Sequence, residues 1–484
     1  MMKNPSRILV FCLIVITLLP LNACALAGEP LYAIRDTNGL WGYIDNQGTL
    51  VIPGTFTNAE DFRGSYAIAC QYPEGFVLLE GEEIDPLYKL DNGEYMKYTG
   101  LEGIIDASGK WVVEPEWFSI MSGDEIGNEI GGWNTGLYCL DRGSLNGFFD
   151  IPSGFFSGII YDDIFFYVGD DLDADLIGVV KDGKAGFVRR STGETVIPFQ
   201  YAPSPGAYFC GDWCLITSLE NPEQKIIIDR QGRETPIPDQ FMPSSDRFYD
   251  GLLLIRDRST GLYGYLDTEG RITIEPQFTE AYTFSEERAV VQTQDGNWAL
   301  ISRDGAFHYI SSEEPAWYFC EHGLIPWFTS VKDSILFLNR DGAEAFTLRI
   351  EGLNGIGSFK ENGTAWYFIR TDSPEAEPYG MESAGLFNDK GKILTPPVFL
   401  TNEETMDLEF SDSLLPVTEL ATLKSGYVDE RGQWVIQPVN GYCQPFREEL
   451  AKIDMDGDTG RYVIIIDRQG NTVYEYSFGD PDSE

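Results

Sequence analysis

The chain has 484 residues, of which 34 are Lys or Arg and 77 are Asp or Glu, so its formal net charge is −43. A surface this acidic repels phosphate backbones and anionic lipid headgroups, which excludes a nucleic-acid-binding protein. Hydrophobic residues make up 43% of the chain and aromatic residues 13%, which excludes a disordered acidic tail. The 51 Gly and 26 Pro favour one array of many turns over two or three separate domains.

Residues 1–27 have the features of an export signal. Lys3 and Arg7 are followed by an apolar stretch, residues 8–19, that is short for a transmembrane helix. Two processing sites compete: cleavage after Ala27 follows an Ala-x-Ala motif, whereas residues 21–24 resemble a bacterial lipobox that would place a lipid on Cys24. An uncleaved membrane anchor is the third alternative. The first two predict an exported protein, either secreted or held at a membrane only through its N-terminal lipid.

One short sequence motif recurs through the mature chain, residues 28–484. A short apolar run is followed by Asp, Asn or Ser, two polar residues and Gly, and then by a second apolar run that often ends in Pro. The first polar position is occupied in turn by Asp45, Asp106, Asp150, Arg189, Asp229, Asp267, Ser302, Asn339, Asn388, Asp429 and Asp467. Ten steps from Asp45 to Asp467 cover 422 residues, a mean spacing of about 42, which indicates a tandem array.

The residues of this motif are typical of a β-hairpin. Asp or Asn accepts hydrogen bonds from the backbone ahead of it, and a glycine three residues later supplies the positive φ that closes the turn. Such glycines are Gly48, Gly109, Gly232, Gly270, Gly432 and Gly470. We therefore predict an all-β fold of about eleven short antiparallel hairpin or three-stranded units, forming a propeller-like or an open curved array. Irregular insertions are expected near residues 70–100 and 306–380.

The first copy, Trp41-Gly42-Tyr43-Ile44-Asp45, resembles the WG-repeat family of bacterial proteins, whose β-rich unit has the pattern W-G-Y-I-D-x-x-G-x-x-V-I-x-P. Other copies lose the tryptophan but keep its glycine, as at Gly264 and Gly426, so the glycine and the turn are expected to be structural. The resemblance implies a repeated binding or scaffolding surface, with no catalytic residues to transfer.

Sites for chemistry are sparse in this sequence. The chain has two histidines, His308 and His322, and the repeated aspartates are interpreted as turn residues rather than acids or bases. Asp454, Asp456 and Asp458 alternate as in a calcium loop, but the later positions depart from an EF-hand, so a metal site is a weak alternative to an acidic hairpin turn. Cys210 and Cys214 form either a local disulfide or two unrelated buried thiols.

These observations predict an exported, non-catalytic repeat protein that provides a binding or scaffolding surface at the cell envelope. No cofactor is expected. Its partner would be a protein or glycan at the cell surface and, given the charge, neutral or basic. The alternative is a secreted carbohydrate-binding or carbohydrate-active protein on a propeller-like scaffold, because the chain holds 10 Trp and 25 Tyr that could stack on sugars.

Overall fold

The computed structural model describes residues 30–72, 100–117, 119–122, 136–141, 145–165, 175–204, 207–369, 382–401, 410–411, 413–457 and 460–478. The export signal, including Cys24, lies outside these residues. The described residues form strands β1 to β40 and no helix, so none of them forms a helix that could cross a membrane.

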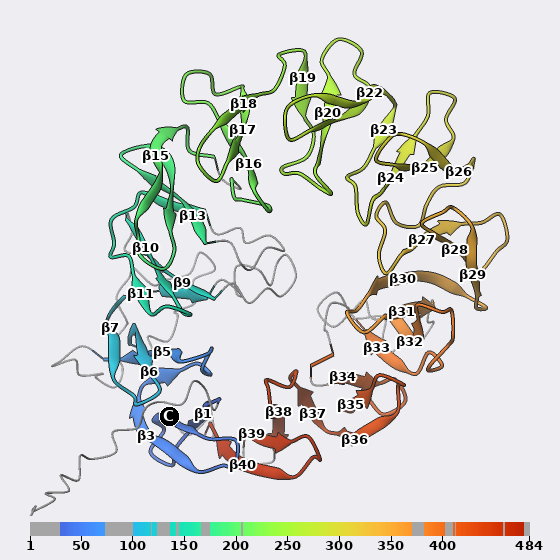
Figure 1. The fold of residues 1–484 in the computed structure, drawn as a ribbon. Coiled ribbons are helices and arrows are strands. Elements are labelled where there is room, and N and C mark those ends of the chain that lie inside the picture. Colours follow the sequence, from blue (N-terminus) through green and yellow to red (C-terminus); the bar gives the residue numbers. More distant parts are fainter. Residues whose placement is uncertain are drawn as a thin grey trace, which may run out of the picture.

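The strands group into eleven consecutive units of three or four strands, numbered here in chain order (Figure 1). Units 1 to 4 consist of β1 (Tyr32–Arg35), β2 (Trp41–Ile44) and β3 (Leu50–Phe56); β4 (Asn58–Ala59), β5 (Tyr66–Gln71), β6 (Leu101–Asp106) and β7 (Trp111–Trp117); β8 (Ser119–Ser122), β9 (Leu137–Asp141), β10 (Asn146–Asp150) and β11 (Phe155–Phe156); β12 (Asp163–Phe165), β13 (Leu176–Lys181), β14 (Lys184–Arg189) and β15 (Thr195–Tyr201). Units 5 to 8 consist of β16 (Trp213–Thr217), β17 (Lys225–Asp229) and β18 (Glu234–Pro236); β19 (Phe241–Pro243), β20 (Leu252–Asp257), β21 (Tyr263–Asp267) and β22 (Ile272–Phe278); β23 (Glu280–Ala281), β24 (Arg288–Gln292), β25 (Trp298–Ser302) and β26 (Phe307–Ser311); β27 (Leu324–Phe328), β28 (Ser334–Asn339) and β29 (Glu344–Arg349). Units 9 to 11 consist of β30 (Leu353–Phe359), β31 (Thr364–Ile369) and β32 (Glu382–Asn388); β33 (Phe399–Thr401), β34 (Leu414–Glu419), β35 (Ser425–Asp429) and β36 (Trp434–Val439); β37 (Gly441–Cys443), β38 (Leu450–Gly457), β39 (Gly460–Asp467) and β40 (Thr472–Ser477).

Neighbouring strands within each unit are antiparallel and follow one another along the chain. The eleven units make ten sheets, because β33 pairs with both β32 and β34 and so joins units 9 and 10 into one seven-stranded sheet. The predicted all-β array of about eleven units is confirmed. The number of strands differs from three in most units, because a short strand often precedes the hairpin and pairs with it, as β19 pairs with β20.

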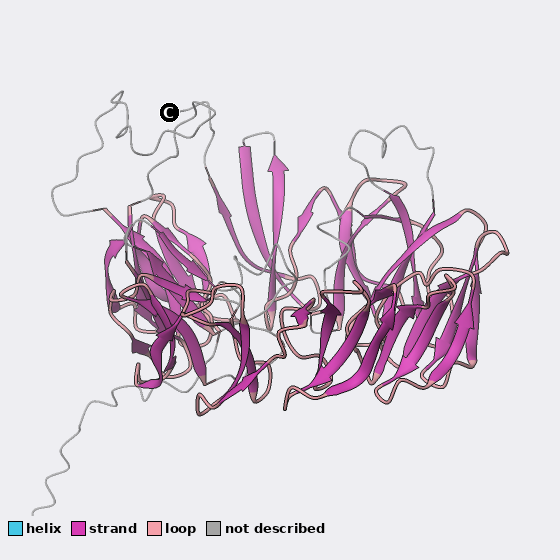
Figure 2. Ribbon diagram, turned by 90° about the horizontal axis from the view of Figure 1, so that it is seen from above, coloured by secondary structure: helices cyan, strands magenta, loops and turns pink. Residues whose placement is uncertain are grey.

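Each unit buries apolar side chains against its neighbours rather than around a centre of its own. In one core cluster, Leu254 and Tyr265 of unit 6 pack with Val291 and Ala299 of unit 7. Figure 2 shows the ring from the side, with units standing next to one another. A three- or four-stranded sheet has too small an apolar face to be stable alone, so stacking of units supplies the core.

The first and last units are in contact, so the array is one closed ring and neither an open curve nor two rings (Figure 1). Tyr32 and Ile34 of unit 1 share a core cluster with Leu450 and Ile465 of unit 11. The Tyr32 hydroxyl also donates a hydrogen bond of 2.9 Å to a backbone carbonyl of unit 11, that of Arg447. Closure leaves no terminal unit with an uncovered apolar face.

The structure describes only part of the two stretches that were expected to be irregular. Residues 73–99 of the first stretch lie outside the described residues. In the second stretch, residues 307–369 contain β26 to β31, which belong to units 7, 8 and 9. The repeat signal is weak there because Ala299 in unit 7 and Leu336 in unit 8 replace the Trp-Gly glycine, and Ala384 in unit 9 replaces the tryptophan.

Candidate functional site

The repeated aspartates are engaged in their own turns. Asp267 lies between β21 and β22, and its Oδ1 accepts hydrogen bonds from the backbone N–H groups of Glu269 at 3.0 Å and Arg271 at 2.9 Å. The same two bonds recur at seven other turns, those of Asp45, Asp106, Asp229, Asn339, Asn388, Asp429 and Asp467. Asn serves equally well because only the acceptor oxygen is needed.

Hydrogen bonding also sets the ionisation of these carboxyls. Burial alone would raise the pKa of Asp267, but the hydrogen bonds and the charge of Arg271 outweigh it and lower the pKa below its ordinary value. The pKa of Asp229 and that of Asp467 are lowered by the same balance, with Arg233 and Asn471 as the respective partners. A carboxylate held ionised in this way suits a turn better than proton transfer at neutral pH.

The turn glycines have two roles, of which the sequence indicated one. All eleven have positive φ, between 68° and 81°: Gly48, Gly109, Gly154, Gly193, Gly232, Gly270, Gly305, Gly342, Gly391, Gly432 and Gly470. Most of them also pack closely against the preceding unit, with little or no room for a side chain. A Cβ atom added to Gly109 would lie 3.1 Å from Ile52, and one added to Gly270 would lie 3.0 Å from the carbonyl oxygen of Pro236. Glycine is therefore needed for the approach of neighbouring units as well as for the turn.

The glycine of the Trp-Gly pair serves a different contact, inside its own unit. A Cβ atom on Gly264 would lie 2.5 Å from the carbonyl oxygen of Ile274, because β22 is displaced towards β21 where their register shifts. Gly42 and Gly426 meet the equivalent backbone at 2.5 and 2.6 Å. In unit 7, Ala299 replaces this glycine, and β25 pairs with β26 in regular register from Trp298 to Leu300. At Gly42, Gly264 and Gly426 the glycine is therefore required because the last strand bulges inwards.

The structure describes two of the three aspartates that were considered as a calcium site. Asp454 and Asp456 lie in β38, and Asp458 lies outside the described residues. The Asp454 carboxylate accepts a hydrogen bond of 2.7 Å from Gln444, and the described residues hold no group of three metal-binding side chains.

The cysteines are thiols wherever the structure describes them. No disulfide joins Cys210 to Cys214 within the described chain. Burial raises the pKa of Cys214 far above its ordinary value. Burial and then a hydrogen bond to Glu286 raise the pKa of Cys320 to about 12. A thiol with so high a pKa is a poor nucleophile, so the nearby His322 has no activated partner in Cys320.

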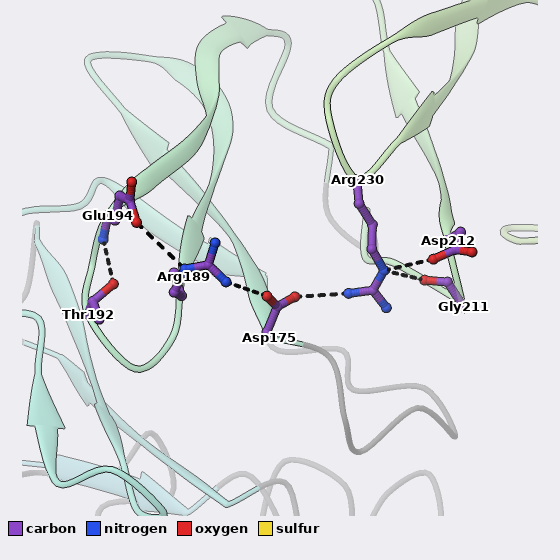
Figure 3. Close-up of polar contacts among 7 residues, drawn as sticks. All are labelled: Asp175, Arg189, Thr192, Glu194, Gly211, Asp212 and Arg230. Atoms are coloured by element: carbon purple, nitrogen blue, oxygen red, sulfur yellow. Dashed lines mark hydrogen bonds and ion pairs between the residues drawn. The ribbon is translucent and has the colours of Figure 1, made fainter.

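A surface recess of about 360 Å³ lies where units 4 and 5 meet. Its polar centre is Asp175, whose two carboxylate oxygens each bind one arginine: Arg189 of unit 4 at 2.5 Å and Arg230 of unit 5 at 2.9 Å (Figure 3). Glu194 and Asp212 lie 3.6 and 3.3 Å from these two guanidinium groups. Leu176 and Val196 add an apolar wall, and Gln231 adds an amide.

This recess lies where the repeat departs from its own rule. Ten of the eleven turns begin with Asp, Asn or Ser, but Arg189 begins the turn of unit 4. Its side chain reaches across to Asp175 instead of capping the turn. The exception was visible in the sequence, whereas the partners Asp175 and Arg230, 14 and 41 residues away, were not. The lining of the recess itself carries two guanidinium groups and one carboxylate, and the exposed carboxylates of Glu194 and Asp212 lie beside them.

Comparison with known protein families matches the WG containing repeat at residues 41–72, 263–298 and 426–457. The chain contains WG repeats at these three segments. The three matches fall on units 1 and 2, units 6 and 7, and units 10 and 11, and they begin at the Trp-Gly position of units 1, 6 and 10, which keeps its glycine as Gly42, Gly264 and Gly426. No curated protein matches this chain over its sequence.

The solved structures that resemble this chain have low sequence identity and low TM-scores. BamB from Moraxella catarrhalis is 15% identical over 48% of this chain and 76% of its own, with a TM-score of 0.26. A eukaryotic initiation factor is 8% identical over 78% of this chain and 94% of its own, with a TM-score of 0.38. The WD40 domain of SCAP from fission yeast is 7% identical over 74% and 96%, with a TM-score of 0.24. These similarities carry no functional argument.

Proposed function

We propose that this protein is an exported, non-catalytic scaffold that binds a protein or glycan partner at the cell envelope. The signal-like residues 1–27 support export, and the net charge of −43 favours a neutral or basic partner. The repeated aspartates and glycines support a structural role, because their hydrogen bonds and contacts build turns and unit interfaces.

The recess between units 4 and 5 is the observation that carries the binding proposal. It combines an apolar wall with polar groups that remain partly exposed: 49% of the Asp175 side chain and 35% of the Arg189 side chain are accessible to solvent. Ligand sites commonly combine an apolar surface with a few polar groups that fix orientation. Residues contributed by two units give the recess a shape that no single repeat has.

A matched pair of substitutions tests this site. The tetrapeptide Asp-Arg-Gln-Gly occurs at 229–232, beside the recess, and at 467–470, in unit 11. Gln231→Trp fills the mouth of the recess without removing its ion pairs, and Gln469→Trp places the same ring on an exposed turn elsewhere. Both variants and the wild type would be immobilised and exposed to solubilised envelope material from the cells that export the protein.

We expect Gln231→Trp to reduce capture of the specific ligand about tenfold or more, equivalent to roughly 1.4 kcal/mol, and Gln469→Trp to leave it unchanged. Equal capture by both variants would place the binding surface elsewhere on the ring. Deleting blocks of repeats is a poorer test because it would open the ring. Fractionation of the producing cells tests export separately: protein confined to the cytoplasm contradicts the envelope assignment.

The second candidate function is carbohydrate binding. It is favoured by a cavity at the seam of units 9, 10 and 11, whose described lining has several hydroxyl groups and no charged side chain.

A further inference from the structure

The seam cavity contains two buried polar atoms without hydrogen-bond partners. Trp366 in β31 of unit 9 is 2% exposed, and Thr401 in β33 of unit 10 is 3% exposed. Both side chains line the cavity, and neither Trp366 Nε1 nor Thr401 Oγ1 has a partner in the structure. Buried polar groups are nearly always hydrogen-bonded, so a group that enters this cavity and bonds with both atoms would be stabilised there.

A second buried tryptophan, Trp327, shows that this fold can provide a hydrogen-bond acceptor for a buried indole N–H group. Trp327 is completely buried in unit 8, and its Nε1 donates a hydrogen bond of 2.6 Å to the carbonyl oxygen of Glu313. Trp366 is almost as completely enclosed, at 2% exposed, but its Nε1 has no equivalent carbonyl partner. The donor is therefore available to a molecule that enters from outside.

Two further hydroxyl side chains line the cavity beside these two groups. Thr418 and Ser425 also line it, and their hydroxyl oxygens are 2.8 Å apart. One hydrogen bond between two hydroxyls uses one of their two protons and leaves the other available. The enclosed space is about 20 Å³, enough for one oxygen-sized group and too small for a ring.

Charge and shape narrow the class of ligand. Among the residues that the structure describes, no Asp, Glu, Lys, Arg or His lines the cavity, although the whole chain has a net charge of −43. Tyr442 lines the same cavity and is 53% exposed, so its ring borders both the cavity and solvent. A neutral molecule with a hydroxyl group and an adjoining flat, weakly polar face fits both features. Carbohydrates have this chemistry, with C–H groups that pack on aromatic rings.

We propose that the seam cavity is a subsite for a neutral carbohydrate. One sugar hydroxyl enters the cavity, accepts a hydrogen bond from Trp366 Nε1 and bonds with Thr401 Oγ1, while the sugar ring packs on Tyr442. A bound water is the other source of the same hydroxyl chemistry, and the experiment separates the two. This site is independent of the recess between units 4 and 5, so its failure would leave that proposal unaffected.

The test uses the mature, full-length chain on an array of neutral oligosaccharides, followed by titration of the strongest binders with tryptophan fluorescence as the readout. Thr401→Val removes the hydroxyl with little change in shape, and Thr401→Ser restores it. Tyr442→Ala removes the exposed ring. The control, Phe328→Ala, removes a ring that is 48% exposed in unit 8, away from the seam.

We expect the wild type to bind at least one neutral oligosaccharide. Thr401→Val and Tyr442→Ala should each weaken that binding about tenfold or more, whereas Thr401→Ser and Phe328→Ala should retain it. Binding that is insensitive to the first two substitutions would overturn the proposal. Absence of binding across the array would also overturn it, and a high-resolution crystal structure grown with sugar that shows only a water between Trp366 and Thr401 would assign the cavity to that water.

Discussion

Gly48 in unit 1 packs against the backbone of Val473 in unit 11, so that a Cβ atom added to Gly48 would lie 2.8 Å from the Val473 carbonyl oxygen. The contact closes the ring in the same way that Gly109 joins units 1 and 2 and Gly470 joins units 10 and 11. One local motif therefore makes both the hairpin turn and the joint between units. This double role predicts that turn glycines differ in importance according to what lies beside them.

Replacing Gly270 by Val should cost more free energy of unfolding than replacing Gly296 by Val. Both glycines have positive φ, 73° and 85°, so both substitutions carry a backbone penalty of about 1–3 kcal/mol. Only Gly270 also faces another unit, whereas an added Cβ on Gly296 meets nothing within 4 Å. Chemical denaturation measures the difference, and hydrogen exchange should show the damage concentrated in units 5 and 6. Equal losses would mean that the contact between units adds no stability.

Asp61 holds the closure of the ring together, and its removal should destabilise the protein strongly. Its Oδ1 accepts hydrogen bonds from the Ala33 backbone N–H of unit 1 at 2.7 Å and from Lys452 of unit 11 at 2.6 Å. The Asp61 and Lys452 side chains are only 11% and 14% exposed, so Asp61→Ala leaves a nearly buried charge unpaired. We expect a loss of about 3–5 kcal/mol in the free energy of unfolding.

A matched control for Asp61→Ala is Lys332→Ala, which breaks a pair with Asp333 in which the lysine is 91% exposed. Its effect should be within about 0.5 kcal/mol of the wild type. Small-angle scattering and hydrogen exchange at β1 and β38 would show whether Asp61→Ala opens the ring. A loss no larger than that of the control would indicate that the apolar contacts close the ring without this ion pair.

The turn aspartates should make stability depend on pH in the acid range. The pKa of Asp267 is lowered in the folded state relative to an unfolded value of about 3.9, so its contribution is present above about pH 4 and disappears as pH falls through the lower folded value. Asp267→Asn keeps the acceptor oxygen and should flatten the fall in stability between pH 4 and pH 2. The reciprocal variant Asn339→Asp should steepen it. Identical slopes in denaturation experiments across this range would contradict the pKa assignment.

Processing of the N-terminus distinguishes the two export chemistries. If Cys24 becomes the lipid-bearing first residue, Cys24→Ser should release the protein from the membrane into the medium. If cleavage follows Ala27, the substitution should change nothing, because Cys24 is discarded. Intact mass spectrometry of the exported protein identifies the route. A chain that begins at Gly28 without lipid mass would rule out the lipoprotein.

The sequence by itself determined the repeating unit, because each turn depends on residues within about five positions of one another. Asp267 and Gly270 with the apolar runs on either side specify a hairpin without reference to the rest of the chain. Eleven such signals therefore predicted the fold class and the number of units. The fainter copies in units 7 and 8 were harder to interpret because regular pairing there needs neither the Trp-Gly glycine nor the proline.

Only the tertiary structure decided how the units are joined and where ligands could bind. Ring closure depends on Tyr32 meeting Arg447, and these residues are 415 positions apart. The recess needs Arg189 and Arg230 on neighbouring units to share Asp175, and the seam cavity needs side chains from three units. No local pattern encodes such distances. They follow from the curvature accumulated over eleven packed interfaces, each of which depends on side chains that vary from one repeat to the next.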